Sequence, residues 1–258
     1  MPMGRPAPRC RAWPPLLKTE GLAQAAVRLR GVSYKWSARQ SFSLSVDEFE
    51  ASRGERILLL GASGSGKSTL LSLLTGIVSP LAGSVEILGQ RLDTFGGSRR
   101  DRFRAEHFGI IFQMFNLLPY GTVIDNVLLP LSFAPQRRAR TVAAGGTDGE
   151  ARRLLSALGL PADIGQQKAA TLSVGQQQRV AAARALVGSP EIIVADEPTS
   201  ALDEDRQEDF LDLLFGQVEA TQATLIMVSH DRRLAGRFTK VVELADLLAA
   251  AKTGNGRG

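Results

Sequence analysis

The feature that most constrains how this chain can fold is a glycine-rich loop at residues 61–68. The loop fits the pattern G-x-x-x-x-G-K-[ST] with Gly61, Ala62, Ser63, Gly64, Ser65, Gly66, Lys67 and Ser68. Residues 57–60 before it are all apolar, as in a buried strand, and residues 68–74 after it are helical in character. A strand, a glycine loop and a helix in this order predict the start of a parallel α/β unit.

The loop has the chemistry of a phosphate site. Its glycines let backbone N–H groups point at phosphate oxygens, and the following helix presents its positive N-terminal end to the same anion. Lys67 is expected to reach the β and γ phosphates and Ser68 to bind Mg²⁺, with Thr69 beside them in the nucleotide site. A plain Gly/Ser-rich turn is the alternative, but the strand–loop–helix context favours ATP or GTP binding.

Composition bounds the class of protein. The chain has 258 residues, of which 44% are hydrophobic, enough for one large α/β domain or for a domain with an inserted subdomain. Its single cysteine, Cys10, excludes an intrachain disulfide and a cysteine metal cluster. No apolar run reaches the ~18–20 residues of a transmembrane helix, so a cytoplasmic location is expected. The net charge of +5 suits phosphate, nucleic acid or an anionic membrane without choosing among them.

The rest of the chain divides into segments of different pattern. Residues 1–24 are rich in Pro, Arg and Ala and predict a mobile basic tail, and residues 251–258 predict a flexible C-terminus. Residues 25–50 alternate with period two, which predicts antiparallel strands with one wet face. Residues 115–188 predict a helical subdomain inserted in the α/β core, and residues 135–149 predict a flexible excursion within it.

Three later apolar runs each end at a polar residue: Gln113, Asp196 and Ser229. Ligands bind outside the carboxyl ends of parallel strands, so the chemistry is expected at these ends. Asp196 is expected to orient Mg²⁺, and Glu197 to polarise the attacking water as a general base or as its positioner. The alternative is that both acids cap a helix after Pro198, but a phosphate loop in the same chain favours the catalytic interpretation.

These residues resemble the motifs of ATP-binding cassette (ABC) ATPases. The segment that resembles the ABC signature motif is Leu172, Ser173, Val174, Gly175 and Gln176. Residues 196–203 resemble the acid strand that runs into the D-loop, where Asp203 is the last residue. The motifs follow in order from about residue 25 to residue 245, which is nearly the whole chain.

Three single residues complete the resemblance. Gln113 resembles the Q-loop glutamine, His230 the switch histidine, and Tyr34 the aromatic that stacks on adenine, with Trp36 as its rival. Taken alone, His230 is more typical of a structural hydrogen bond and Tyr34 of a core position, and Gln113 suits a solvated strand end. Their order along the chain favours the functional interpretation.

The resemblance implies a P-loop NTPase with a RecA-like core, an N-terminal antiparallel β subdomain and the inserted helical subdomain, over residues 25–250. It implies two cassettes paired head to tail, with each ATP and its Mg²⁺ between the loop of one and the signature of the other. Ser173 and Gly175 would then touch the γ-phosphate across the interface, at the N-terminus of a helix that is predicted to start near Gln176, and Gln176 would belong to the same nucleotide site. Gln113 would sense Mg²⁺ and the water, His230 would bond the γ-phosphate and Glu197, and Asp203 would communicate between the two sites.

Residues 109–119 and 172–186 are similar to one branch of this family, which contains lipoprotein-release, macrolide-export and cell-division ATPases. That similarity implies an ATP-hydrolysing subunit that forms a homodimer and drives a separate integral membrane permease with an extracytoplasmic domain, for export or mechanotransmission. The chain would lie on the inner face of the cell membrane, held there by the permease. Residues 115–130 would form the docking surface, although their apolar side chains also suit an ordinary core.

Two other functions remain open at this point. One is a non-transport ABC ATPase that regulates cell division on the same fold. The other is an ABC protein that acts on nucleic acid. No nucleic-acid partner is expected, because the chain shows neither a long coiled-coil insertion nor a second cassette.

One departure from the family pattern is testable. Val174 stands where the signature usually has glycine, and a β-branched residue restricts the backbone and adds bulk at the expected dimer interface. We predict that Val174 tunes the ATPase without abolishing it, so Val174→Gly should change the turnover number measured by phosphate release. An unchanged turnover number would show that position 174 is neutral.

Overall fold

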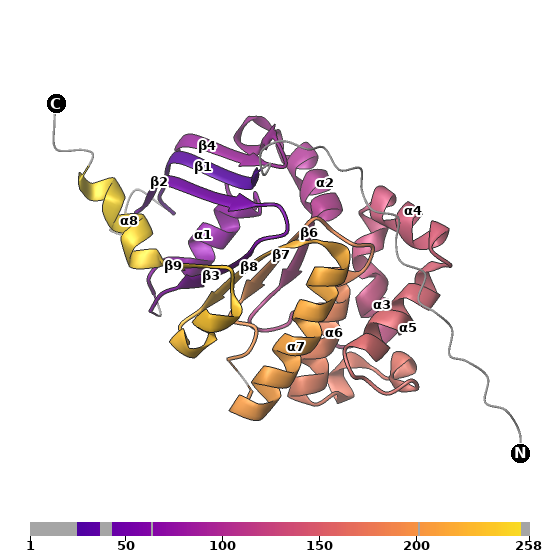
Figure 1. Ribbon diagram of the computed structural model, residues 1–258. Helices are drawn as coiled ribbons and strands as arrows, with labels where there is room; N and C mark the ends of the chain where they lie inside the picture. Colours follow the sequence, from indigo (N-terminus) through magenta and orange to yellow (C-terminus); the bar gives the residue numbers. More distant parts are fainter. Residues whose placement is uncertain (1–24, 37–42, 63, 201, 254–258) are drawn as a thin grey trace, which may run out of the picture.

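The computed structural model describes residues 25–36, 43–62, 64–200 and 202–253, and its strands form two sheets (Figure 1). The first sheet has the order β2-β1-β4-β5 and pairs antiparallel. Its strands are β1 Ala25–Tyr34, β2 Leu44–Ser52, β4 Ala82–Ile87 and β5 Gln90–Arg91. The second sheet has the order β6-β7-β8-β3-β9 and pairs parallel. Its strands are β3 Arg56–Leu60, β6 Phe108–Ile111, β7 Ile192–Asp196, β8 Thr224–Ser229 and β9 Lys240–Glu243.

Helices connect and cover the sheets. They are α1 Lys67–Leu74, α2 Gly97–His107, α3 Val123–Leu128, α4 Pro135–Ala143, α5 Thr147–Ala157, α6 Val174–Leu186, α7 Glu204–Thr221 and α8 Leu244–Thr253. None of these described helices is long and apolar enough to cross a membrane. The predicted fold class is confirmed: a parallel α/β core carries an antiparallel β subdomain and a helical insertion between β6 and β7.

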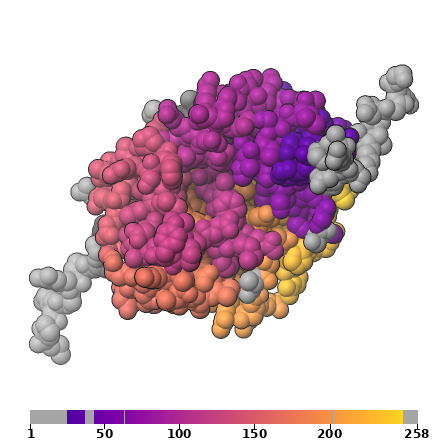
Figure 2. All heavy atoms as spheres, turned by 180° about the vertical axis from the view of Figure 1, so that it is seen from behind, coloured from indigo at the N-terminus to yellow at the C-terminus, as the bar shows by residue number. Residues whose placement is uncertain are grey.

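The helical insertion and the antiparallel sheet lie apart on the molecule. Figure 1 shows α3, α4 and α5 gathered on one side, with β1, β2 and β4 on the other. In the view from behind, the pink residues of the insertion again lie on the side opposite the indigo strands β1 and β2 (Figure 2). The tail at residues 1–24 lies outside the described residues, and α8 runs past residue 250 to Thr253.

The parallel sheet separates two hydrophobic cores. Ile57 and Leu59 of β3 pack into a core with the antiparallel sheet and α1. Leu58 and Leu60 of the same strand pack into the other core with α3, α5, α6 and α7. A strand buried on both faces reads as a continuous apolar run, which is why residues 57–60 show no alternation.

Strand register brings the expected polar ends together. Leu60 pairs with Ser229, and Asp196 pairs with Val228, so β3, β7 and β8 end at one level. The glycine loop, Glu197 and His230 each follow directly from one of these ends. The three later apolar runs correspond to β6, β7 and β8, and their parallel pairing confirms the prediction that they belong to a parallel sheet.

The predicted flexible excursion at residues 135–149 is wrong. Residues of this segment form α4 and the start of α5. Pro135 stands in the first turn of α4, where its missing N–H is harmless, and the Glu106 carboxylate accepts hydrogen bonds from the backbone N–H groups of Gln136 and Arg137. The sequence misleads here because its arginines and glycines look like a solvated loop.

Arg137 holds α4 against the core. Its side chain is buried, with 1% of the residue exposed, and its guanidinium donates to four backbone carbonyls, of Ala105, Phe108, Ala185 and Val187. Burial lowers the pKa of Arg137 to about 10, which still leaves the guanidinium charged at neutral pH. One side chain therefore ties α2, β6 and the end of α6 to the helical insertion.

Replacement of the Arg137 guanidinium should show how much it contributes to the free energy of unfolding. Arg137→Met keeps the length but leaves buried carbonyls without donors, so we expect a loss of about 3 kcal/mol or more in the free energy of unfolding. Urea unfolding followed by circular dichroism measures the loss. The control is Arg138→Met, an exposed neighbour on the same helix, which should change stability by less than about 0.5 kcal/mol. Equal effects of the two substitutions would contradict the assignment.

Candidate functional site

The glycine loop closes on the ammonium group of its own lysine. Gly64 and Gly66 adopt positive φ angles of 77° and 99°, which glycine reaches without strain. Gly66 is the N-cap of α1 and provides no side-chain cap, so its first-turn N–H groups are left for an anion. Lys67 Nζ donates to the carbonyls of Gly61 at 2.7 Å and Ala62 at 3.0 Å. Ser63 lies outside the described residues.

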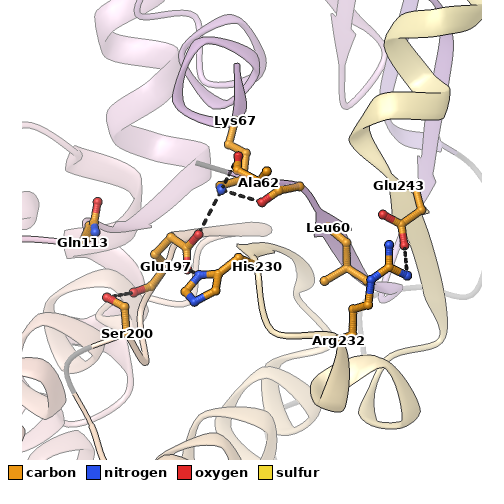
Figure 3. Close-up of a pocket in the computed structure, with 10 residues that line it drawn as sticks. Leu60, Ala62, Lys67, Gln113, Glu197, Ser200, His230, Arg232 and Glu243 are labelled. Carbon is orange, nitrogen blue, oxygen red and sulfur yellow. Dashed lines mark hydrogen bonds and ion pairs between the residues drawn. The ribbon is translucent and has the colours of Figure 1, made fainter. Parts of the chain in front are cut away.

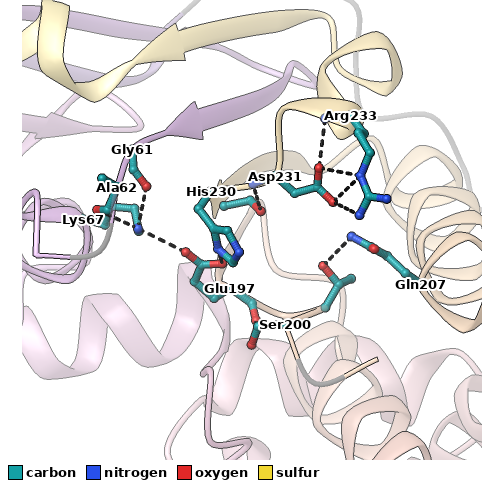
Figure 4. A network of polar contacts seen from close by, with 11 residues as sticks. Gly61, Ala62, Lys67, Glu197, Ser200, Gln207, His230, Asp231 and Arg233 are labelled. Atoms are coloured by element: carbon teal, nitrogen blue, oxygen red, sulfur yellow. Dashed lines mark hydrogen bonds and ion pairs between the residues drawn. The ribbon is translucent and has the colours of Figure 1, made fainter. Parts of the chain in front are cut away.

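Glu197 is the centre of the site. It follows β7 and is buried, with 8% of the residue exposed, and its φ of 46° lies in the left-handed region that L-residues rarely adopt. One carboxylate oxygen lies 3.1 Å from Lys67 Nζ and the other 2.8 Å from His230 Nδ1 (Figure 4). A buried carboxylate is costly unless it is paired, and here both oxygens are.

A second polar pair lies beside the first. Ser68 Oγ donates to Asp196 Oδ2 at 2.9 Å. Burial raises the pKa of the Asp196 carboxyl, and the negative charge of Glu197 adds to that effect. A hydroxyl and a carboxylate are the hard oxygen ligands that Mg²⁺ prefers. Among the described residues, there is no cluster of three or more His, Cys, Asp or Glu side chains that could hold a metal. Ser68 and Asp196 supply two oxygen ligands, and Mg²⁺ commonly takes its other ligands from waters and phosphate oxygens.

Several of these site residues line a common cavity of about 580 Å³ (Figure 3). The predicted site residues that line it are Gly61, Ala62, Lys67, Gln113, Glu197 and His230. Ser65 belongs to the same loop, and its hydroxyl is buried without a hydrogen-bond partner among the described residues. An unsatisfied donor in a phosphate loop is suited to a ligand oxygen.

Besides Leu60, sequence reasoning missed three polar residues that line the cavity. Ser200 donates its hydroxyl to the carbonyl of Glu197 at 3.0 Å, and Arg232 pairs with Glu243 at 2.7 Å across the cavity edge. Glu243 ends β9, so the rule that ligands gather at the carboxyl ends of strands would have found it. That strand offers only two apolar residues in a row, too weak a pattern to recognise.

Of the signature residues, Ser173 and Val174 are exposed on the surface and Leu172 is buried in the core, and none of the five lines this cavity. Ser173 is the N-cap of α6 and accepts a hydrogen bond from the N–H of Gln176, whose side chain in turn accepts from the N–H of Ser173. The helix therefore begins at Val174, two residues before the predicted start. Val174 is 50% exposed, and a side chain added at Gly175 would meet nothing within 4 Å. The N-terminal end of α6 is therefore open to solvent at Val174 and Gly175.

The two candidate adenine aromatics sit together next to α1. The rings of Tyr34 and Trp36 meet edge to face with centroids 5.3 Å apart. Trp36 is 51% exposed, and its indole N–H donates to Thr69 Oγ1 at 3.0 Å. The hydrogen bond ties the end of β1 to the helix after the phosphate loop and leaves both aromatics as candidates.

The segment after His230 is tied to the start of α7 through Arg233, whose contact with Asp231 is drawn in Figure 4. Arg233 donates to Asp231 and also to Glu204, and its hydrogen bonds lower the pKa of Asp231 to about 2. Asp203 is the N-cap of α7 and accepts from the N–H of Arg206. Ala201 between the acid turn and Asp203 lies outside the described residues. The site thus brings the predicted acids, lysine and histidine together but leaves the signature and Asp203 outside the cavity.

Comparison with known proteins identifies the family of the chain. A family model described as ABC transporter matches residues 44–200. The lipoprotein-releasing system ATP-binding protein LolD of Syntrophotalea carbinolica is 39% identical over 88% of this chain and 97% of its own length. The macrolide export ATP-binding/permease protein MacB of Rhodopseudomonas palustris is 36% identical over 89% of this chain, and the match covers 34% of MacB.

Solved structures show the same fold. MJ0796, a bacterial ABC transporter cassette solved as a dimer, has a TM-score of 0.72 and 32% identity, covering 84% of this chain and 94% of that chain. A dimeric post-hydrolysis state of MJ0796 bound to ADP and Pi matches with the same TM-score and identity. The chain therefore belongs to the ABC transporter family, as an ATP-binding cassette that hydrolyses ATP in association with transport.

Proposed function

We propose that this cassette works as one half of a head-to-tail homodimer that drives a separate membrane permease. The observation that carries the catalytic part is Glu197, a buried acid held between Lys67 and His230 at the mouth of the phosphate loop. The proposed cassette domain covers residues 25–250, and its inserted helical subdomain covers about residues 115–188.

The polar contacts of the site suggest how ATP is received. Lys67 exchanges the carbonyls of Gly61 and Ala62 and the carboxylate of Glu197 for the β and γ phosphates. Glu197, released from Lys67, polarises the attacking water while His230 orients its other oxygen. Gln113, at the cavity edge, contacts the water and the metal. Each residue already lies within the cavity, so only side-chain movements are needed.

Ser68, Asp196 and Gln113 are proposed to hold Mg²⁺ together with the phosphates. When bound, the ion neutralises phosphate charge and orients the β and γ oxygens. The Ser68–Asp196 hydrogen bond places both donors at one point before any ligand arrives. The oxygen atoms of the Ser68 hydroxyl and the Asp196 carboxylate would hold the ion there.

The exposed start of α6 supports the dimer. Ser173 and Gly175 lie outside the cavity of their own chain, although the resemblance assigns them to a γ-phosphate. A second copy can present them to that phosphate with the positive end of α6. Asp203, also exposed, would then link the two sites, and MJ0796 supports this arrangement because its cassette is dimeric.

The relatives support a membrane partner. LolD is named as part of a lipoprotein-releasing system, and MacB carries an ATP-binding/permease name. By analogy, the chain lies on the inner face of the cell membrane, held by a permease with an extracytoplasmic domain. Met114, Tyr120 and Phe133 are 81%, 76% and 65% exposed, and three such large side chains near residues 115–130 suit a docking surface.

The decisive substitution is Glu197→Gln. An amide keeps the shape but cannot act as a base, so we expect ATP hydrolysis to fall by ~100-fold or more while ATP still binds. Size-exclusion chromatography with ATP should show a trapped dimer. A variant that stays monomeric with ATP and turns over normally would sink the proposed mechanism.

We predict that the substitution Asp196→Asn lowers the ATPase activity and raises the thermal stability of the nucleotide-free chain. Because burial raises the pKa of Asp196, its ionised form destabilises the empty fold, so Asp196→Asn should raise the melting temperature without nucleotide while abolishing Mg²⁺-dependent hydrolysis. The gain should shrink as the pH falls through the pKa of Asp196, because the native carboxyl then becomes neutral too. Calorimetry between pH 4 and pH 8 at about one-unit steps measures it. A melting temperature lower than that of the native chain throughout would refute the idea.

A further inference from the structure

Helix α6 carries a buried arginine near its C-terminal end. Arg184 is 7% exposed, and its guanidinium donates to two backbone carbonyls, of Asn116 at 2.6 Å and of Phe115 at a shorter distance. These carbonyls are 68 and 69 residues away in the sequence. Within the described part of the chain, no carboxylate pairs with Arg184, and burial lowers its pKa. Burial of a guanidinium costs desolvation free energy, and among the described residues only two backbone carbonyls offset that cost.

The segment that Arg184 holds is the turn directly after Gln113. Phe115 and Asn116 both have φ in the left-handed region, at 57° and 51°. The N–H of Phe115 donates to Phe112 and that of Asn116 to Met114, at 3.0 and 2.6 Å. Two successive left-handed L-residues persist only where surrounding contacts enforce them. The guanidinium provides such a contact, because it binds both residues at once.

The end of α6 that carries Arg184 is itself fixed. A methyl group added at Gly109 of β6 would lie 2.1 Å from the carbonyl oxygen of Ala185, so strand and helix are in direct backbone contact. Arg137 binds the carbonyls of Ala185 and Val187 from the other side. At mid-helix, Gln178 is fully buried and donates to the carbonyl of Pro198 at 2.6 Å.

Helix α6 therefore connects three parts of the site. Its free N-terminus bears Ser173, its middle touches the turn after Glu197, and Arg184 grips the turn after Gln113. A 13-residue helix moves as a stiff rod on this scale. Whatever displaces one of these segments must displace the helix or break one of its buried hydrogen bonds.

We propose that Arg184 is a positioning residue that locks residues 113–116 to the signature helix, so that movement of this turn is transmitted to Ser173. The idea rests on the proposed roles of Gln113 and Ser173, and it adds the mechanical link between them. Arg184 contacts neither ATP nor the reacting atoms and acts through the backbone of Phe115 and Asn116.

The test follows the mobility of the turn in the full chain. A spin label is attached to Met114→Cys in a Cys10→Ser background, since Cys10 is the only cysteine of the sequence. Arg184→Met removes the two donors, and the label should tumble faster in the nucleotide-free spectrum. The turnover number should fall ~10-fold through misplacement of Gln113, while the KM for ATP changes less than ~2-fold. Arg184→Lys keeps the charge but reaches one carbonyl, so both readouts should be intermediate.

The matched control is Arg140, which also binds carbonyls near the end of α6. It donates to Gly188 and Ser189 at 3.0 and 3.3 Å but does not touch the turn. Arg140→Met should leave the label at position 114 and the turnover number unchanged. It should instead loosen a label at Val142→Cys, an exposed position on the same helix α4. Arg184→Met should leave that second label unchanged.

Two results would overturn the proposal: an unchanged label at position 114 in Arg184→Met, or equal effects of the two arginine substitutions on that label. If Arg184→Met folds poorly, the comparison of Arg184→Lys with the parent decides on the same terms. Failure of the proposed function is recognised separately. If Glu197→Gln hydrolyses ATP normally while the label at position 114 loosens as expected, the catalytic assignment fails and the link through Arg184 stands.

Discussion

The site depends on one constraint, that β3, β7 and β8 end at the same level of a parallel sheet. Their register places the phosphate loop, Glu197 and His230 one residue beyond the last paired positions. The neighbouring strands matter most for Glu197, because its left-handed backbone conformation persists only where surrounding contacts enforce it. Two buried cores on opposite faces hold the strands, and the polar ends have only the cavity to face.

Around this sheet, buried arginines bound to carbonyls fix the helical insertion. Arg137 fixes α4, and Arg184 fixes the turn beyond β6, each from a buried position where backbone carbonyls accept its hydrogen bonds. A guanidinium offers five donors in a fixed plane, so it can join backbone segments that share no sheet or helix. The insertion is thereby attached through directional bonds, which transmit displacement better than apolar packing does.

The phosphate loop, the four parallel runs and the antiparallel strands within residues 25–50 follow from the sequence because their signals are local, whereas β4 and β5 of the antiparallel sheet were not predicted. The pairing of Glu197 with His230 follows from the family resemblance. Arg137 and Arg184 could not be predicted, because their partners lie about 30 to 70 residues away and an arginine in a helix usually indicates solvent. The helix α4 was missed for the same reason, and β9 because two apolar residues do not define a strand.

The contacts of Lys67 have a consequence for the empty cassette. Its ammonium group is occupied by two carbonyls and a carboxylate from the same chain. These three groups compete with the phosphates of an incoming nucleotide for the Lys67 ammonium group, at a high effective concentration because they belong to the same chain. The affinity for ATP is therefore a difference between two well-satisfied states. Such an exchange lets the cassette release spent nucleotide without leaving a bare buried charge behind.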